Sequence, residues 1–232
     1  EFGDLVRNQL HESHRLGVTI EFGVTATVAD VLRRRPDTVV VATGAVAARP
    51  WWAPGDAGWI VDVREVLEGS ASPTGTVVVL DELGFHHATS AAELLADRGC
   101  SVEMVTPGMV VGQDLGVTLD LETFNIRAAS KGITQTTECV PMSVDGHTVT
   151  FQHHPTGTML TRTPDWLVLA VPANPAEALY LELRDHPEVI GGGIEVHRVG
   201  DAVAPRRAHA AVVDGERVGA AIGPSARLAV RN

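Results

Sequence analysis

Three short runs of aliphatic residues, rich in valine, limit the folds that are open to this chain. They lie at Thr38–Ala42, Thr76–Leu80 and Trp166–Val171. Each run is continuous, as in strands of a parallel sheet that are covered on both faces. Segments with helical spacing of apolar residues lie before, between and after these runs, at Val28–Arg34, Ala88–Arg98 and Ala176–Arg184. This order of elements predicts an α/β fold built on a parallel sheet.

The middle of the chain predicts a βαβ unit. The strand at Thr76–Leu80 is followed by the helix Ala88–Arg98, which Gly99 ends, and by a second strand at Ser101–Thr106. The length is typical of such units, and the helix carries small alanines that let it pack closely on a sheet. Further strands are expected at Val18–Ile20, Ile133–Met142, Thr148–His153, Met159–Thr163 and Val196–Val199, and further helices at Phe2–Leu16, Val63–Glu68, Leu119–Ser130 and about Ala208–Ile222.

Charge and composition exclude several classes of function. Lys and Arg total 18 against 29 Asp and Glu, which gives a formal net charge of −11. Nucleic acids and anionic membranes bind clustered positive charge, so neither is expected as a partner. No apolar stretch reaches the roughly 18 residues of a membrane span, which predicts a soluble protein. The two cysteines, Cys100 and Cys139, are far apart in the chain, so a reducing cytoplasm is the expected setting.

Two short motifs follow predicted strands. Ala42-Thr43-Gly44 ends the first valine-rich run and is followed by Arg49-Pro50 and Pro54-Gly55, while Gly200-Asp201-Ala202 follows the strand at Val196–Val199. In this order, they resemble the "ATG…PR…PG" segment and the C-terminal "GDA" flavin motif of flavoproteins with two dinucleotide-binding domains. The chain as a whole resembles the C-terminal dinucleotide-binding region of the trimethylamine dehydrogenase and 2,4-dienoyl-CoA reductase family of old-yellow-enzyme-like flavin oxidoreductases.

The resemblance implies a Rossmann-like three-layer fold of the FAD/NAD(P)-binding type. Residues 1–71 and 166–232 would form the two parts of a flavin- or ADP-type domain, and residues 72–165 an inserted NAD(P)-type domain. The expected cofactor-binding residues are Ala42, Thr43, Gly44, Gly200, Asp201 and Ala202, with FAD or ADP as the ligand. A carboxylate between a strand and a helix can accept a hydrogen bond from a ribose or ribityl hydroxyl; alternatively, Asp201 is an ordinary turn or capping aspartate.

Two departures from the family pattern limit what this chain can bind. It contains no G-x-G-x-x-G turn, and the βαβ unit that carries this turn at the start of the family's flavin-type domain is absent. In the inserted domain, Asp81, Leu83 and His86 take the places of the three glycines of a nicotinamide site. Acidic side chains there oppose a diphosphate, and Thr106 stands where an acidic residue would bind the ribose of NAD. NAD(P)H binding is therefore doubtful.

The functional hypothesis is a nucleotide-binding region of a flavin-dependent NADH:flavin oxidoreductase or amine-dehydrogenase-like enzyme. The resemblance places the catalytic barrel upstream in the same polypeptide, with FMN and a 4Fe-4S cluster there. It also suggests a homo-oligomer and an electron-transfer partner. No residue of this chain is assigned a catalytic or metal-binding role, and the chain alone is not expected to catalyse a reaction. The alternative hypothesis is a non-catalytic scaffold or docking module with decayed nucleotide sites.

Overall fold

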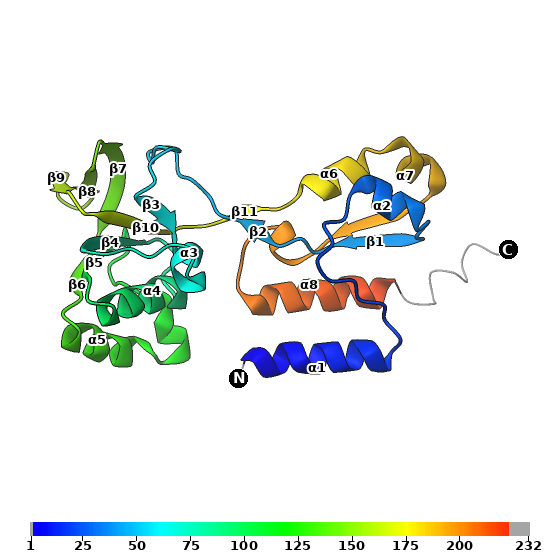
Figure 1. The fold of residues 1–232 in the computed structure, drawn as a ribbon, viewed down its shortest axis with the longest axis horizontal. Helices are drawn as coiled ribbons and strands as arrows, with labels where there is room; N and C mark the ends of the chain where they lie inside the picture. The colour runs from blue at the N-terminus through cyan, green and yellow to red at the C-terminus, as the bar shows by residue number, and fades with distance from the viewer. Residues whose placement is uncertain (1, 223–232) are drawn as a thin grey trace. The chain divides into compact units, whose positions relative to one another are not determined.

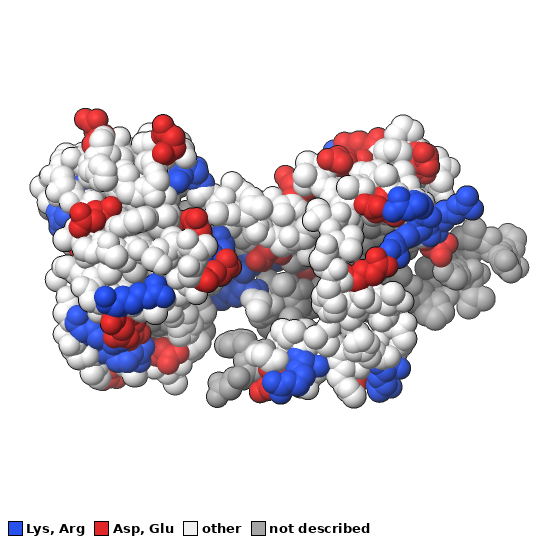
Figure 2. All heavy atoms as spheres, in the orientation of Figure 1, with Lys and Arg blue, Asp and Glu red and all other residues white. Residues whose placement is uncertain are grey.

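A computed structural model describes residues 2–222. Its contacts divide the chain into two compact units. Of the described residues, the first unit comprises 2–41, 177–199 and 216–222, and the second comprises 42–176 and 200–215. On the face shown in Figure 2, acidic and basic side chains are interspersed.

The second unit is built on a five-stranded parallel sheet (Figure 1). In spatial order its strands are β3 (Ile60–Asp62), β10 (Trp166–Ala170), β4 (Thr76–Asp81), β5 (Ser101–Val105) and β6 (Thr134–Thr136). One face packs against α3 (Val63–Glu68), α4 (His86–Asp97) and α5 (Leu121–Ser130). The other packs against an antiparallel sheet of β7 (Cys139–Asp145), β8 (Thr148–His153) and β9 (Thr158–Arg162). This is the layered arrangement that the aliphatic runs predict.

The central strand β4 shows why a continuous aliphatic run forms here. Successive side chains of a strand point to opposite faces of the sheet. Val77 and Val79 therefore pack with the helices α3, α4 and α5, whereas Val78 and Leu80 pack against the antiparallel sheet and Trp52. All four are 3% exposed or less. Both faces of this strand are apolar because both are covered.

The first unit contains a smaller parallel sheet of β1 (Thr38–Val41) and β12 (Glu195–Arg198). Its other elements are α1 (Phe2–Arg15), α2 (Val28–Arg33), α6 (Ala178–Arg184) and α7 (Pro187–Gly192), while α8 (Ala208–Ala221) extends across the boundary between the units. The core is small, with Val41, Leu183 and Val189 at its centre. Val40 is 44% exposed, so the expectation that this run is covered on both faces is wrong for β1.

The helix caps follow the sequence closely. Thr27 caps α2 and Asp62 caps α3, each in a capping box with the acidic residue three positions later, Asp30 and Glu65. Each cap gives orphan backbone N–H groups of the first helical turn an acceptor. The predicted starts of both helices are confirmed.

Several predicted elements are wrong or differ in extent. Val18–Ile20 forms no strand, and its residues are not paired with another strand. The run at Ile133–Met142 is interrupted at Glu138, whose φ of 56° breaks it into β6 and β7, which belong to different sheets. The strand β3 and the helix α7 were not anticipated. Four short elements complete the described chain: β2 (Ala45–Val46), β11 (Asn174–Pro175) and the 3₁₀ turns η1 (Gln113–Thr118) and η2 (Gly200–Ala202).

The sheet pairing also bears on the expected domain limits. Thr38–Val41 shares a sheet with Glu195–Arg198, and both lie in the parts expected to form the flavin- or ADP-type domain. However, β10 pairs with β3 and β4 in the larger sheet, so Trp166–Ala170 does not join β1. The larger sheet thus includes residues on both sides of the predicted span 72–165. The assignment of the parts to flavin-type and NAD(P)-type domains remains a prediction.

An ion pair connects the antiparallel sheet to strand β5 of the parallel sheet. Glu103 on β5 receives hydrogen bonds from the Arg162 guanidinium, at 2.7 and 2.9 Å, and from the Thr136 hydroxyl at 2.6 Å. Burial raises the pKa of the Glu103 carboxyl, but the hydrogen bonds from Arg162 and Thr136 outweigh it and leave the pKa lowered. The carboxylate therefore stabilises the fold at pH values above its usual 4.5, and this contribution is lost as the pH falls through the lowered pKa.

We expect Glu103→Gln to lower the free energy of unfolding by about 1–2 kcal/mol at pH 7, because Arg162 keeps a weaker, uncharged partner. Urea unfolding at pH 7 and pH 4 measures this loss, which should shrink at the lower pH. Glu182→Gln, on the exposed side of α6, serves as the control and should change stability little. Equal losses in the two variants at pH 7 would contradict the assignment.

Candidate functional site

The two predicted motifs begin at the same edge of the small parallel sheet. The strands β1 and β12 run in register, with Val41 opposite Arg198. The Val199 N–H donates to the Val41 carbonyl at 3.0 Å, so the strands end side by side. In α/β proteins, ligands bind outside the carboxyl ends of parallel strands. The pairing thus brings the starts of Ala42–Gly44 and Gly200–Ala202 to one edge.

The Ala42-Thr43-Gly44 segment is held by the chain that returns at Ala176. The Thr43 hydroxyl donates to the Ala176 carbonyl, and the Ala176 N–H donates to the Gly44 carbonyl at 3.0 Å. Gly44 has a φ of 75°, a conformation that side chains with a Cβ rarely adopt. A Cβ built on Gly44 meets no atom within 4 Å among the described residues. The structure therefore explains the glycine at this position by its backbone conformation and not by a lack of space for a side chain.

The Gly200-Asp201-Ala202 turn packs against the helix that follows it. Gly200 has a φ of 62°, and a Cβ built on it would lie 3.3 Å from the Ala211 Cβ. Its N–H donates to the Asp214 carboxylate at 3.3 Å. The Asp201 carboxylate accepts the backbone N–H of Arg206 at 3.0 Å. The structure therefore gives Asp201 a turn-forming contact and leaves its cofactor role a prediction, since a carboxylate can accept several hydrogen bonds.

The segment between the first motif and β3 begins with the short strand β2 and is otherwise irregular, although its sequence predicts an irregular loop throughout. Arg49 donates two hydrogen bonds of 3.1 Å from its guanidinium to the Ile60 carbonyl, which ties the loop to the start of β3. Trp52 is 8% exposed and packs into the core, whereas its neighbour Trp51 is 86% exposed. The two tryptophans thus have different environments, and only Trp52 fastens the loop.

A second site lies at the carboxyl ends of β4 and β5, where Asp81, Leu83 and His86 take the places of the three glycines of a nicotinamide site. Asp81 is 1% exposed there. Its two carboxylate oxygens accept the N–H groups of Gly84 at 2.7 Å and Gly112 at 2.8 Å. Together with Glu82, Thr106 and Asp114 it lines a crevice of about 350 Å³. The sequence predicts that Asp81 repels a diphosphate, and the structure shows that its carboxylate also occupies backbone N–H groups of the surrounding loops.

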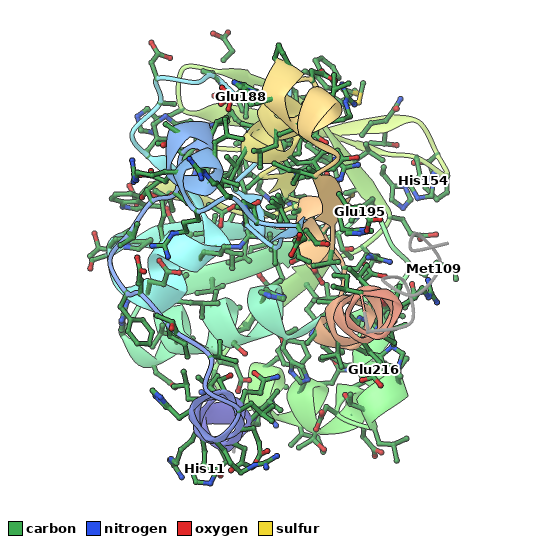
Figure 3. The ribbon with its side chains drawn as sticks, turned by 90° about the vertical axis from the view of Figure 1, so that its right-hand side faces the viewer. His11, Met109, His154, Glu188, Glu195 and Glu216 are labelled. Carbon is green, nitrogen blue, oxygen red and sulfur yellow. The ribbon has the colours of Figure 1, made fainter. Side chains whose placement is uncertain are left out.

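Burial controls the ionisation of the acidic groups in this crevice. It raises the pKa of Asp81, against the opposing effect of the backbone N–H groups of Gly112 and Gly84. The pKa of Glu82 is also raised, by burial and by the charge of Asp81. Thr106 is 3% exposed, and its hydroxyl accepts the Gly108 N–H at 3.1 Å. Met109, in the same loop, is 72% exposed and points away from the ribbon (Figure 3).

Searches for metal sites and membrane spans give negative results for the described residues. Within residues 2–222, no three His, Cys, Asp or Glu side chains are grouped so that they could hold a metal ion. None of the helices in the same range is long and apolar enough to cross a bilayer.

The parallel sheets, their covering helices and the turns at their carboxyl ends define a Rossmann-like fold of the FAD/NAD(P)-binding type. No family model matches the chain. It is 28% identical to an N,N-dimethylglycine/sarcosine dehydrogenase of Chromohalobacter salexigens, over 89% of this chain and 35% of that protein. It is 27% identical to a probable N-methylproline demethylase of Rhizobium meliloti, over 90% of this chain and 34% of that protein.

Among solved structures, 6-hydroxypseudooxynicotine amine oxidase from Pseudomonas geniculata N1 superposes with a TM-score of 0.80. The two are 25% identical, and the match covers 89% of this chain and 32% of that one. These similarities confirm the resemblance to the flavin oxidoreductase family that the two motifs indicated. The chain spans about a third of the length of the curated relatives it matches.

Proposed function

We propose that this chain is the nucleotide-binding region of a flavin-dependent oxidoreductase that oxidises N-methylated amines. The observation that carries the proposal is the pair of matches over about nine-tenths of the chain, 89% and 90%. Both matched proteins bear names of enzymes that act on N-methylated amino acids. Oxidation of the amine would take place in the part of the enzyme that this region does not include, where the family resemblance suggests FMN and a 4Fe-4S cluster.

The role proposed for this region is to hold FAD or ADP at the edge where β1 and β12 end. Asp201 would accept a hydrogen bond from a ribose or ribityl hydroxyl, and Gly44 and Gly200 supply the left-handed backbone turns. A bound flavin would supply the capacity to accept and pass on electrons. Because the chain contains no G-x-G-x-x-G turn, the contacts with a pyrophosphate would have to come from residues outside this sequence.

The first test uses the longer polypeptide that includes this region and the remaining part found in its relatives. We expect Asp201→Ala to weaken FAD or ADP binding about 10- to 100-fold, because one charge-assisted hydrogen bond is lost. The 232-residue chain alone should purify colourless. The measurements are the nucleotide content per chain after gel filtration and calorimetric titration with ADP.

The matched control is Asp145→Ala, at the end of β7 in the antiparallel sheet. This substitution should leave nucleotide content unchanged. If Asp201→Ala retains wild-type occupancy and affinity, Asp201 is a turn residue only. Oxidation of sarcosine by the longer protein tests the substrate class separately from the cofactor site.

The second candidate function is a scaffold without nucleotide. Two observations favour it: the Asp81 carboxylate occupies backbone N–H groups in the loops that follow β4 and β5, and Asp201 already accepts the Arg206 N–H. This hypothesis predicts that neither ADP nor FAD copurifies with the longer protein. Stoichiometric nucleotide in that protein would exclude it.

A further inference from the structure

An arginine from a distant part of the chain contacts Asp114, one of the residues that line the crevice at the ends of β4 and β5. Arg207 precedes α8, in the segment that carries Gly200-Asp201-Ala202. Its guanidinium forms an ion pair with the Asp114 carboxylate and lies 4.4 Å from the centre of the Phe85 ring. All of these residues belong to the second compact unit.

The surface that receives Arg207 is built from two loops that are fastened to each other. The Asp114 N–H donates to the Gly84 carbonyl at 2.8 Å. Asp81 connects the same two loops, because its carboxylate accepts the N–H groups of both Gly84 and Gly112. Phe85 follows Gly84 directly, so the ring and the carboxylate are held on one platform.

This pairing of groups suits a guanidinium in particular. A planar guanidinium stacks on an aromatic ring while its N–H groups donate to a carboxylate, which an ammonium does less well. The crevice is acidic, with Asp81, Glu82 and Asp114 in its lining, so a cation is favoured there. The side chains of Arg207 and Asp114 are each 47% exposed, so their ion pair is of the weak, reversible kind.

We propose that Asp114 and Phe85 form a guanidinium-binding site that Arg207 occupies in cis, as a latch. The closed latch holds residues 200–207 on the loops that carry Phe85 and Asp114. Loosening of these loops and release of the segment that carries the Gly-Asp-Ala turn are then one event. This inference goes beyond the proposed function and does not depend on whether a nucleotide binds at Asp201.

The test is amide hydrogen exchange on the 232-residue chain, followed in peptides that cover residues 82–89, 110–116 and 200–208. We expect Arg207→Ala to speed exchange about 5- to 20-fold in all three segments, since an exposed ion pair and a cation–π contact are lost together. Asp114→Asn should give a similar change. The double variant should be no faster than the single ones, because both substitutions remove the same contact.

Arg184→Ala is the matched control, since Arg184 is an exposed arginine that also pairs with a carboxylate, that of Asp185. It should leave the three segments unchanged. Added methylguanidinium chloride, compared with equal sodium chloride, should restore protection of residues 82–89 in Arg207→Ala but not in the double variant. Unchanged exchange in both single variants, or additive effects in the double variant, would overturn the proposal. So would equal effects of the two salts.

Discussion

Replacement of Asp81 by alanine should lower the free energy of unfolding by about 2–4 kcal/mol, because two N–H groups lose their acceptor in a buried site. The acceptor is 1% exposed, and both of its oxygens are used, by Gly84 and Gly112. The cost of burying the Asp81 charge acts in the opposite direction on the free energy of unfolding. Burial raises the pKa of Asp81, which means that its charge is costly in the folded state and that removal of this charge returns part of the loss.

Urea unfolding of the wild type, Asp81→Ala and Asp81→Asn measures this effect. The asparagine variant keeps one acceptor oxygen and should lose less stability than the alanine variant. Asp97→Ala is the control, because Asp97 makes an exposed ion pair with Lys131 and should contribute no more than about 1 kcal/mol. If Asp81→Ala costs no more than Asp97→Ala, the two backbone contacts are not what holds these loops.

The second expected result concerns nicotinamide nucleotides. NADH and NADPH should bind this chain with dissociation constants no better than about 1 mM, which corresponds to about −4 kcal/mol. A diphosphate needs free backbone N–H groups, and Asp81 already occupies those of Gly84 and Gly112. Glu82 and Asp114 add negative charge to the same crevice, and Leu83 adds a side chain where backbone would have to approach phosphate.

Isothermal titration calorimetry with each nucleotide tests this expectation, and a micromolar constant for either would show that it is wrong. Glu82→Gln separates two causes. This substitution removes a charge from the crevice but leaves the bonds of Asp81 intact, so it should not restore binding. Restored binding would identify repulsion, rather than occupied donors, as the obstacle.

Much of the larger sheet could be predicted from sequence because its strands β4 and β10 are aliphatic on both faces. The parallel pairing of β4 with β5 follows from the predicted βαβ unit, whereas the partners of β10 could not be predicted. The run at Trp166–Val171 is equally suited to either sheet, and only the fold shows that β10 lies between β3 and β4. The three-residue strand β3 is too short to give a pattern, and the break at Glu138 depends on a backbone conformation that glutamate rarely adopts.

The candidate sites show the same division. Ala42-Thr43-Gly44 and Gly200-Asp201-Ala202 could be found from residue type and order, since each follows a strand. The bond between Asp81 and Gly112 joins residues 31 apart in sequence, and it depends on the path of the loop after β5. Likewise, no local pattern connects Arg207 with Phe85.

The bond between Asp81 and its two loops also constrains how this region can evolve. A ligand that organises its own binding loops makes their stability depend on its concentration. Here an internal side chain performs that task, so the loops are held whatever the supply of nucleotide. A mutation that returns glycine to position 81 would first remove this internal anchor, before any affinity for a diphosphate was gained. A change to a nucleotide-binding crevice therefore needs more than one substitution, because the first one lowers the stability of the loops.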